Sequence, residues 1–446
     1  MLKGFFFYKT KGITFQSFIL IILFLFYNLS VTAEVNNQIY AAEITNESLT
    51  LEECLDSAYQ ANPTLKAAVA QELVTSAGII QAKTRINPKY NVELAPVETT
   101  YRLADISTTL QLGNKRKFRI QVVKNQLEST NATVRTLAWK IREDTAQAFF
   151  ELAIAAKTLN IVQDYLKIAN DLLDISIKKE KVGDVAYLDV LRAQTALAQV
   201  KLQLAIAEAN FNQAKRKLNL IMGRTANSVI EITPPSIFNL EQPPSTLPDF
   251  EDLITEAKNS RPEYSQFKAN IAVEDSKVKL ANSAKWPDVV VGGGLSLVTK
   301  TRRSFLGENP SFGPEAYFQV PLTFVDHQQG PKAISQATIK QIEAQTIAFN
   351  NQVEQEVSLA YGNLEGTHKQ LHIFLEDVLP KQKEILSLSQ KSYELGFIDL
   401  TGAVTAQQTA VSSQISYLQA ITTYFQSIIA LERAVGKTLS FDFAEL

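Results

Sequence analysis

The sequence predicts a mainly α fold with a small β part, built from long helical hairpins in tandem. Gly183 and Gly396 lie 213 residues apart, and each is followed by an Ala-Gln pair at the same distance. The stretch 115–181 contains neither proline nor glycine, as a very long helix requires. Residues with alternating polarity precede it and indicate strands. Self-similarity at a fixed spacing indicates that one architecture is built twice.

Further landmarks repeat at matching positions. The tetrads Met222–Thr225 and Val435–Thr438 both carry glycine second and threonine fourth. Pro63 and Pro88 are 25 residues apart, and so are Pro262 and Pro287. The duplication therefore covers almost the whole chain beyond its first residues.

Composition excludes several classes of protein. The chain has 446 residues and a net charge of −2, so it offers no broad electrostatic attraction to nucleic acid. Its single cysteine, Cys54, cannot form an intramolecular disulfide and lies in a helical pattern that predicts burial.

Residues 1–33 have the pattern of a signal peptide. Three lysines precede the apolar run 18–26, and small residues end at Ala33. The run is about half the length of a membrane-spanning helix, which needs about 20 apolar residues. An uncleaved N-terminal anchor is the alternative. Because no later segment is long and apolar enough to span as a helix, any membrane crossing is expected to use strands in a closed barrel.

We expect the mature chain to begin near Glu34, because the small-residue site ends at Ala33. N-terminal sequencing of the protein isolated from the cell envelope measures this directly. A start at Met1 would contradict export by this route.

The first structural repeat is expected at 34–224. It begins with short helices and continues with strands near 90–112, a long helix at 115–181 and a return helix at 185–222. A helix-free, proline-rich connector at 225–248 follows.

The second repeat is expected at 249–438, before a C-terminal tail at 439–446. Its strands are predicted near 288–299 and 315–324, its long helix at 333–395 and its return helix at 400–435. Pro380 is the expected kink in the long helix.

The return helix of the first repeat carries two apolar rows on opposite sides, both with the seven-residue period of a coiled coil. One row includes Leu188 and Leu191, and the other includes Val190 and Leu197. A helix with two seams packs between two neighbours. This pattern favours an α-barrel with a wet lumen over a compact four-helix bundle.

Together these motifs resemble the TolC-like outer-membrane efflux protein family over nearly the whole mature chain, and in particular its heavy-metal efflux branch. The segments that carry the resemblance are 49–55, 62–63, 87–88, 111–116, 182–194, 320–330, 393–396 and 406–407. The heavy-metal branch usually has a second glycine where this chain has Asn114.

The resemblance implies a homotrimer in the outer membrane, with four strands per chain forming a shared twelve-stranded transmembrane β-barrel and the helices forming a tunnel across the periplasm. Such a channel is a passive exit duct for metal ions or small toxic compounds. The implied partners are a periplasmic adaptor (membrane fusion) protein, an inner-membrane efflux pump and outer-membrane lipid. The adaptor would dock at the hairpin tips, here Val182, Gly183, Leu395 and Gly396.

Asp189 and Tyr393 are the gate residues that the resemblance implies. In the family, residues at these places link neighbouring hairpins and keep the tunnel closed. A phenol hydroxyl can donate to a carboxylate, so we expect a hydrogen bond between this pair. The alternative is a solvated aspartate and a packed tyrosine.

No catalytic, cofactor or metal site is expected from the remaining residues. His368 and His372 have a spacing that can hold a metal, but no cysteine or close carboxylate pattern completes the set. The predicted function is therefore an efflux duct and not an enzyme. The alternative is a periplasmic coiled-coil adaptor or a structural envelope protein, which would not run as a trimer from outer membranes.

Overall fold

The computed structural model describes residues 48–92, 100–233, 247–298, 311–322 and 325–439. Residues 49–446 form one compact unit of the chain. The expected signal peptide and most of the connector and tail lie outside the described residues. Among those described, no helix has both the length and the hydropathy to cross a membrane.

The described part of the first repeat contains four helices and two strands. In chain order they are α2 (Leu51–Ala61), α3 (Pro63–Lys83), β1 (Lys89–Val92), β2 (Thr100–Leu110), α4 (Lys115–Lys181) and α5 (Tyr187–Ile221). Local sequence explains the first boundaries. Thr50 and Glu53 form a capping box at the start of α2, and the Asn62 side chain caps α3 ahead of Pro63.

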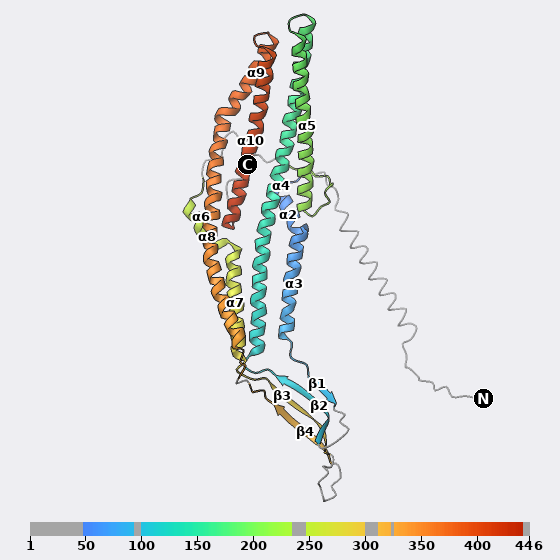
Figure 1. The fold of residues 1–446 in the computed structure, drawn as a ribbon, viewed down its shortest axis with the longest axis vertical. Helices are drawn as coiled ribbons and strands as arrows, with labels where there is room; N and C mark the ends of the chain where they lie inside the picture. Colours follow the sequence, from blue (N-terminus) through green and yellow to red (C-terminus); the bar gives the residue numbers. More distant parts are fainter. Residues whose placement is uncertain (1–47, 93–99, 234–246, 299–310, 323–324, 440–446) are drawn as a thin grey trace, which may run out of the picture. The chain divides into compact units, whose positions relative to one another are not determined.

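The second repeat has the same order with one interruption. Its elements are α6 (Phe250–Ser260), α7 (Pro262–Ser283), β3 (Val289–Val298), β4 (Ser311–Gln319), α8 (Gln329–Ile373), η2 (Phe374–Val378), α9 (Leu379–Glu394) and α10 (Leu400–Val435). The fold class predicted from the sequence is confirmed: long helical hairpins in tandem with a small antiparallel sheet (Figure 1).

The second long helix is not continuous, and it begins four residues earlier than expected at 333. A π-helical turn, η2, separates α8 from α9 immediately before Pro380. Proline has no N–H to donate and its ring crowds the preceding turn, which accounts for the break there. The first long helix, α4, has no proline and runs unbroken.

Both long helices begin after a residue in the left-handed conformation, Asn114 with φ 61° and Gln328 with φ 65°. Asparagine tolerates this region better than most side chains. Asn114 therefore adopts the backbone conformation that a glycine would supply at this junction.

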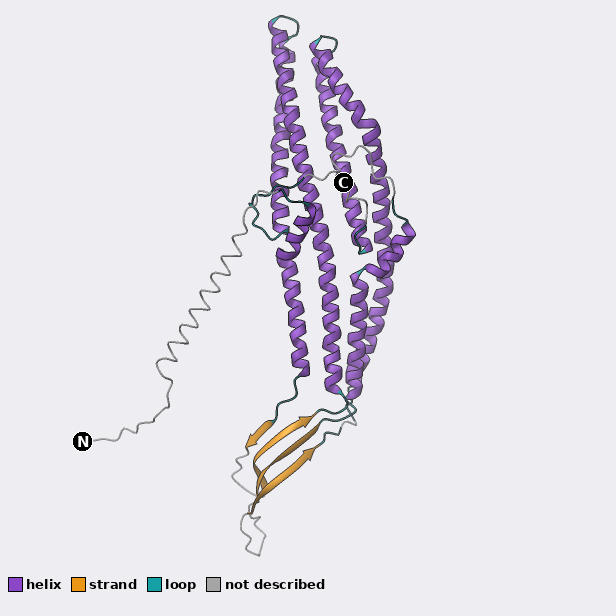
Figure 2. Ribbon diagram, turned by 180° about the vertical axis from the view of Figure 1, so that it is seen from behind, coloured by secondary structure: helices purple, strands orange, loops and turns teal. Residues whose placement is uncertain are grey.

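The four strands form one antiparallel sheet in the order β1-β2-β3-β4 (Figure 2). The two repeats meet in the middle, where β2 pairs with β3 from Thr100↔Val298 to Leu110↔Val289. The last strand was expected near 315–324 but lies at Ser311–Gln319. Pro321 cannot donate to a ladder, and β3 offers partners only between Val290 and Val298.

The sheet has one apolar and one polar face. Paired residues in an antiparallel sheet share a face, so the register sorts the side chains. The apolar face is exposed and includes Tyr90, Val92, Ile106, Val291, Leu295 and Phe318. On the polar face the Tyr317 hydroxyl donates to Asp105 at 2.6 Å. Glycine at 292 makes room for the Tyr317 ring, which a Cβ would meet at 2.5 Å.

Helix α4 is the central element of the helical part. It packs against α5, α3, α7 and α10, and the main apolar core lies where α4, α8 and α10 meet. In that core the Phe150 and Phe425 rings stack with centroids 4.0 Å apart. The hairpins α4–α5 and α9–α10 turn at the same end of the helices, opposite the sheet (Figures 1 and 2).

An equivalent side-chain hydrogen bond holds the end of each return helix, α5 and α10. In the first repeat Asn62 Nδ2 donates to the carbonyl of Ile221 at 2.9 Å. In the second, Arg261 donates to the carbonyl of Ala434 at 3.4 Å, and Ala434 is 213 residues after Ile221. The duplicated sequence therefore folds into duplicated contacts, with arginine in place of asparagine.

Candidate functional site: the hairpin tips

The two hairpin turns have the same backbone geometry. Gly183 has φ 75° and Gly396 has φ 81°, which only glycine adopts without strain. Each turn closes with a hydrogen bond over five residues, from Asp184 N to Lys179 O at 2.9 Å and from Phe397 N to Ser392 O at 2.8 Å. This is the Schellman pattern, in which a glycine ends a helix.

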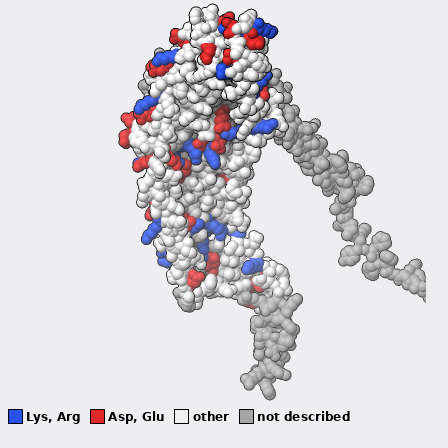
Figure 3. Space-filling view, turned by 45° about the horizontal axis from the view of Figure 1, so that its top comes forward, with Lys and Arg blue, Asp and Glu red and all other residues white. Residues whose placement is uncertain are grey.

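The tips expose large apolar side chains. Val182 is 80% exposed, Leu395 69% and Phe397 79%. Sequence reasoning missed Phe397, although it directly follows the tip glycine. Charged side chains of both signs lie on the end of the molecule that carries the turns (Figure 3). Exposed apolar groups with a polar surround are typical of a protein–protein contact surface.

Behind the tips, three residues join the two hairpins. Tyr393 of α9 is 1% exposed, and its hydroxyl lies 2.8 Å from Ser176 Oγ of α4. Ser176 itself donates to Leu172 O at 2.8 Å, so the phenol is the donor between the pair. Lys179 Nζ donates to the backbone carbonyl of Tyr393 at 2.9 Å and lies 5.0 Å from the centre of its ring. We call Ser176, Lys179 and Tyr393 the hairpin latch.

An apolar cluster surrounds the latch. Leu172, Ala193, Leu400 and Ala403 are buried beside Tyr393, one or more from each of α4, α5 and α10. Burial raises the pKa of the Tyr393 phenol. The hydrogen bond with Ser176 lowers it, and the negative charge of Asp189 raises it, so that the pKa lies above its ordinary value. The phenol therefore stays protonated and able to donate over the physiological pH range.

Asp189 is not the hydrogen-bond partner of Tyr393 within this chain, contrary to the sequence expectation. Its carboxylate pairs with Arg192 one turn along α5, at 3.1 Å. The phenol is turned toward α4, where Ser176 and Lys179 lie one helical turn apart on the same face. No sequence motif marked these two residues. Their spacing of seven and four residues before Gly183 is the only signal.

His368 and His372 have different surroundings. His372 Nδ1 lies 3.1 Å from Glu376 Oε2 on the exposed surface, while the ring of His368 lies 6.3 Å from that of Tyr424. Within the described ranges, no group of three or more metal-binding side chains gathers.

The architecture combines tandem helical hairpins with exposed tips and a sheet with one apolar face. Comparison with known proteins identifies the family. The family model for outer membrane efflux proteins matches residues 54–224 and 253–437. The chain belongs to the outer membrane efflux protein family.

Individual relatives agree with this assignment. The chain is 25% identical over 393 residues to the cobalt-zinc-cadmium resistance protein CzcC of Cupriavidus metallidurans, covering 87% of this chain and 90% of the relative. It resembles the solved Campylobacter jejuni CmeC outer membrane channel with a TM-score of 0.65 and 15% identity, over 89% and 88% of the two chains. The outer-membrane channel OprN matches with a TM-score of 0.65 and 17% identity, over 86% and 89%.

Proposed function

We propose that three copies of this chain assemble into an outer-membrane channel that serves as the passive exit duct of a tripartite efflux system. The observation that carries this proposal is a four-stranded sheet with an exposed apolar face, in which β1 and β4 each lack a second partner strand among the described residues. An unpaired edge in lipid leaves backbone groups without hydrogen bonds. Pairing β4 of one copy with β1 of the next satisfies them.

The helices also offer surfaces for neighbouring copies. On α3, Leu73 and Ile80 are 66% and 71% exposed, and on α8, Ile334 and Ile347 are 67% and 65% exposed. These helices belong to different repeats, so each copy has two distinct apolar faces. Two such faces suit a closed ring in which each copy contacts both neighbours.

The substrate class that we propose is a metal ion or a small toxic compound. The similarity to a cobalt-zinc-cadmium resistance protein over most of both chains supports metal export. The chain itself acts as a conduit and not as an enzyme. Outer-membrane fractionation together with trimer formation in mild detergent tests the proposal, and a monomer in the soluble periplasmic fraction would favour the adaptor alternative.

We further propose that the tips, with Val182, Gly183, Leu395, Gly396 and the newly found Phe397, dock a periplasmic adaptor that links the channel to an inner-membrane pump. The support is the exposure of three apolar side chains at the turns. The hairpin latch, with Asp189 beside it, would hold the tip end of the channel closed until docking. Both roles follow from the position of these residues at the free end of the hairpins.

Replacing Val182 and Leu395 together by aspartate is expected to reduce export at least tenfold while leaving the trimer intact. Two charges placed in an apolar contact must be desolvated without partners, which costs several kcal/mol. Export of the toxic compound from cells expressing each variant measures the effect. Val229, which is 63% exposed beyond the end of α5, supplies the matched control as Val229→Asp. Equal export by all variants would remove the docking assignment.

A further inference from the structure

A cavity of about 540 Å³ lies between the end of α3 and the start of α4. Two arginines, Arg85 and Arg119, line it together with the polar side chains of Gln81, Thr84 and Asn87, and the remaining wall is Gly78, Ala82, Ile86 and Val123. Of the described residues that line this cavity, none carries a carboxylate. Two guanidinium groups beside neutral donors are suited to an anionic oxygen ligand.

The cavity is held open by specific contacts. Arg119 Nε donates to Ala82 O at 3.1 Å, and its NH2 group donates to Thr84 O at 3.2 Å. Arg116 Nε donates to Lys83 O at 2.7 Å. These bonds occupy the last two carbonyls of α3 and that of Thr84, the residue after it, and they fix Arg119 in the wall. At Gly78 a Cβ would lie 3.3 Å from Val123, so glycine permits the close approach of α3 and α4 that forms the back of the cavity.

The cavity lies at the boundary between the helices and the sheet. Residues 84–88 connect α3 to β1, so Arg85 and Ile86 stand within a few residues of the first strand. An apolar surface continues from there: Ile86 is 41% exposed, Tyr90 68% and Val92 54%. Tyr90 pairs with Ile106 and so lies on the apolar face of the sheet. Asn87 of the positively charged recess thus lies three residues before Tyr90, which is on the face that the proposed function places in lipid.

We propose that this cavity binds the phosphate headgroup of an anionic phospholipid, with the acyl chains lying along β1 on the apolar face of the sheet. Basic and aromatic side chains at the edge of an apolar membrane surface are the arrangement that recognises lipid headgroups. The inference rests on the proposed function, because it needs the sheet to be in a bilayer. The two arginines of the cavity favour an anionic headgroup. The apolar surface of β1 can contact acyl chains, which free phosphate lacks.

Phosphatidylglycerol binding to the purified full-length trimer tests the proposal, with phosphatidylcholine as the zwitterionic comparison in the same detergent. Arg85→Gln is expected to weaken phosphatidylglycerol binding about fivefold, and Arg85→Gln with Arg119→Gln about thirtyfold, from the contribution of each basic side chain at an anionic surface. Arg216→Gln removes an exposed arginine of α5 outside the cavity and should bind as the parent does. Inorganic phosphate should compete poorly, because it lacks acyl chains.

Three results would overturn the site. Equal phosphatidylglycerol binding by the parent and Arg85→Gln would mean that the cavity is not the site. Full competition by inorganic phosphate would mean that lipid chains play no part. Loss of the trimer in Arg85→Gln, with and without lipid, would mean that the cavity contacts a neighbouring copy of the chain and not a lipid. Failure of the proposed function gives a different result, since the parent chain would then not insert into bilayers of either composition.

Discussion

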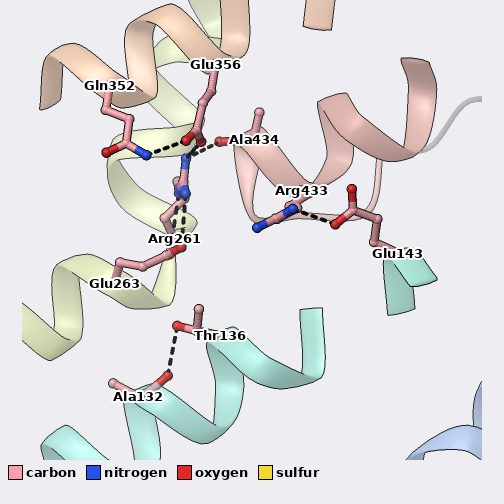
Figure 4. A network of polar contacts seen from close by, with 9 residues as sticks. All are labelled: Ala132, Thr136, Glu143, Arg261, Glu263, Gln352, Glu356, Arg433 and Ala434. Atoms are coloured by element: carbon pink, nitrogen blue, oxygen red, sulfur yellow. Dashed lines mark hydrogen bonds and ion pairs between the residues drawn. The ribbon is translucent and has the colours of Figure 1, made fainter. Parts of the chain in front are cut away.

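Arg261→Met is expected to lower the free energy of unfolding by about 3 kcal/mol, the largest stability effect that we predict for a single substitution. The side chain is 5% exposed at the joint between α6 and α7 (Figure 4). It forms ion pairs with Glu356 of α8 and with Glu263, the latter at 2.9 Å, and stacks over Phe349 with its guanidinium carbon 4.9 Å from the ring centre. Removing one partner of a buried pair typically costs 3–5 kcal/mol. The lower end applies because the Glu356 side chain is 38% exposed.

Urea unfolding of the purified protein, followed by its helical signal, measures this loss. Lys258→Met is the matched control, because it removes the same charge from the neighbouring pair with Glu354, where both side chains are nearly half exposed. Exposed pairs contribute little to stability, so the control should unfold close to the parent. Equal unfolding of the two variants would show that the Arg261 network does not stabilise the joint.

The pH dependence of stability gives a second measure of the same network. Partial burial raises the pKa of Glu356, but hydrogen bonds from Arg261 and Gln352 outweigh it, and the pKa lies below its ordinary value. A carboxyl group with a lowered pKa in the folded state contributes stability above its unfolded pKa and loses it as the pH falls through the folded value. The parent should therefore lose stability on acidification more steeply than Arg261→Met.

Lys179→Met is expected to raise the ratio of open to closed channels at least tenfold in a planar bilayer. The charged amine donates to the carbonyl of Tyr393, and a hydrogen bond from a charged group contributes about 1.5–3 kcal/mol. If this bond is present only while the hairpins are joined, its loss shifts the open–closed balance by that amount. Tyr393→Phe removes a neutral hydrogen bond of about 1 kcal/mol and should open the channel about fivefold.

Lys178→Met provides the control, since it removes the adjacent, exposed lysine and the same charge. Asp189→Asn should have a smaller effect than Lys179→Met, because Asp189 pairs with Arg192 and not with the phenol. Single-channel recording distinguishes the cases. A larger effect of Asp189→Asn than of Lys179→Met would mean that the Asp189 carboxylate holds the hairpins together, as the resemblance implied.

The boundaries of α4 and α10 could be read from the sequence because local chemistry sets them. The run 115–181 lacks proline and glycine, and α4 occupies it fully. Helix α10 begins at Leu400, after Asp399 whose side chain accepts from Gly402 N, and ends before Gly436 in the left-handed conformation. Capping groups and positive-φ glycines act within a few residues of themselves, so one sequence suffices to place them.

The last strand could not be placed in this way. The sequence indicated a strand near 315–324, but the ladder runs from Ser311 to Gln319. Pro314 lies inside the strand, opposite Leu295, just before the expected start of the strand at 315. Pairing with β3 decides the register, and the partner strand comes from a distant part of the chain.

The sequence by itself determined the duplication, the long hairpins and their glycine turns, because these depend on composition, periodicity and spacing along the chain. Its motifs also carried the resemblance to the family that the family model then showed. The tertiary structure alone decided which side chains join the hairpins and where cavities form. Ser176 meets Tyr393 across 217 residues, and Arg85 and Arg119 line one cavity. Such pairs depend on how helices rotate and pack against one another, which is set by the sum of many weak contacts rather than by any local pattern.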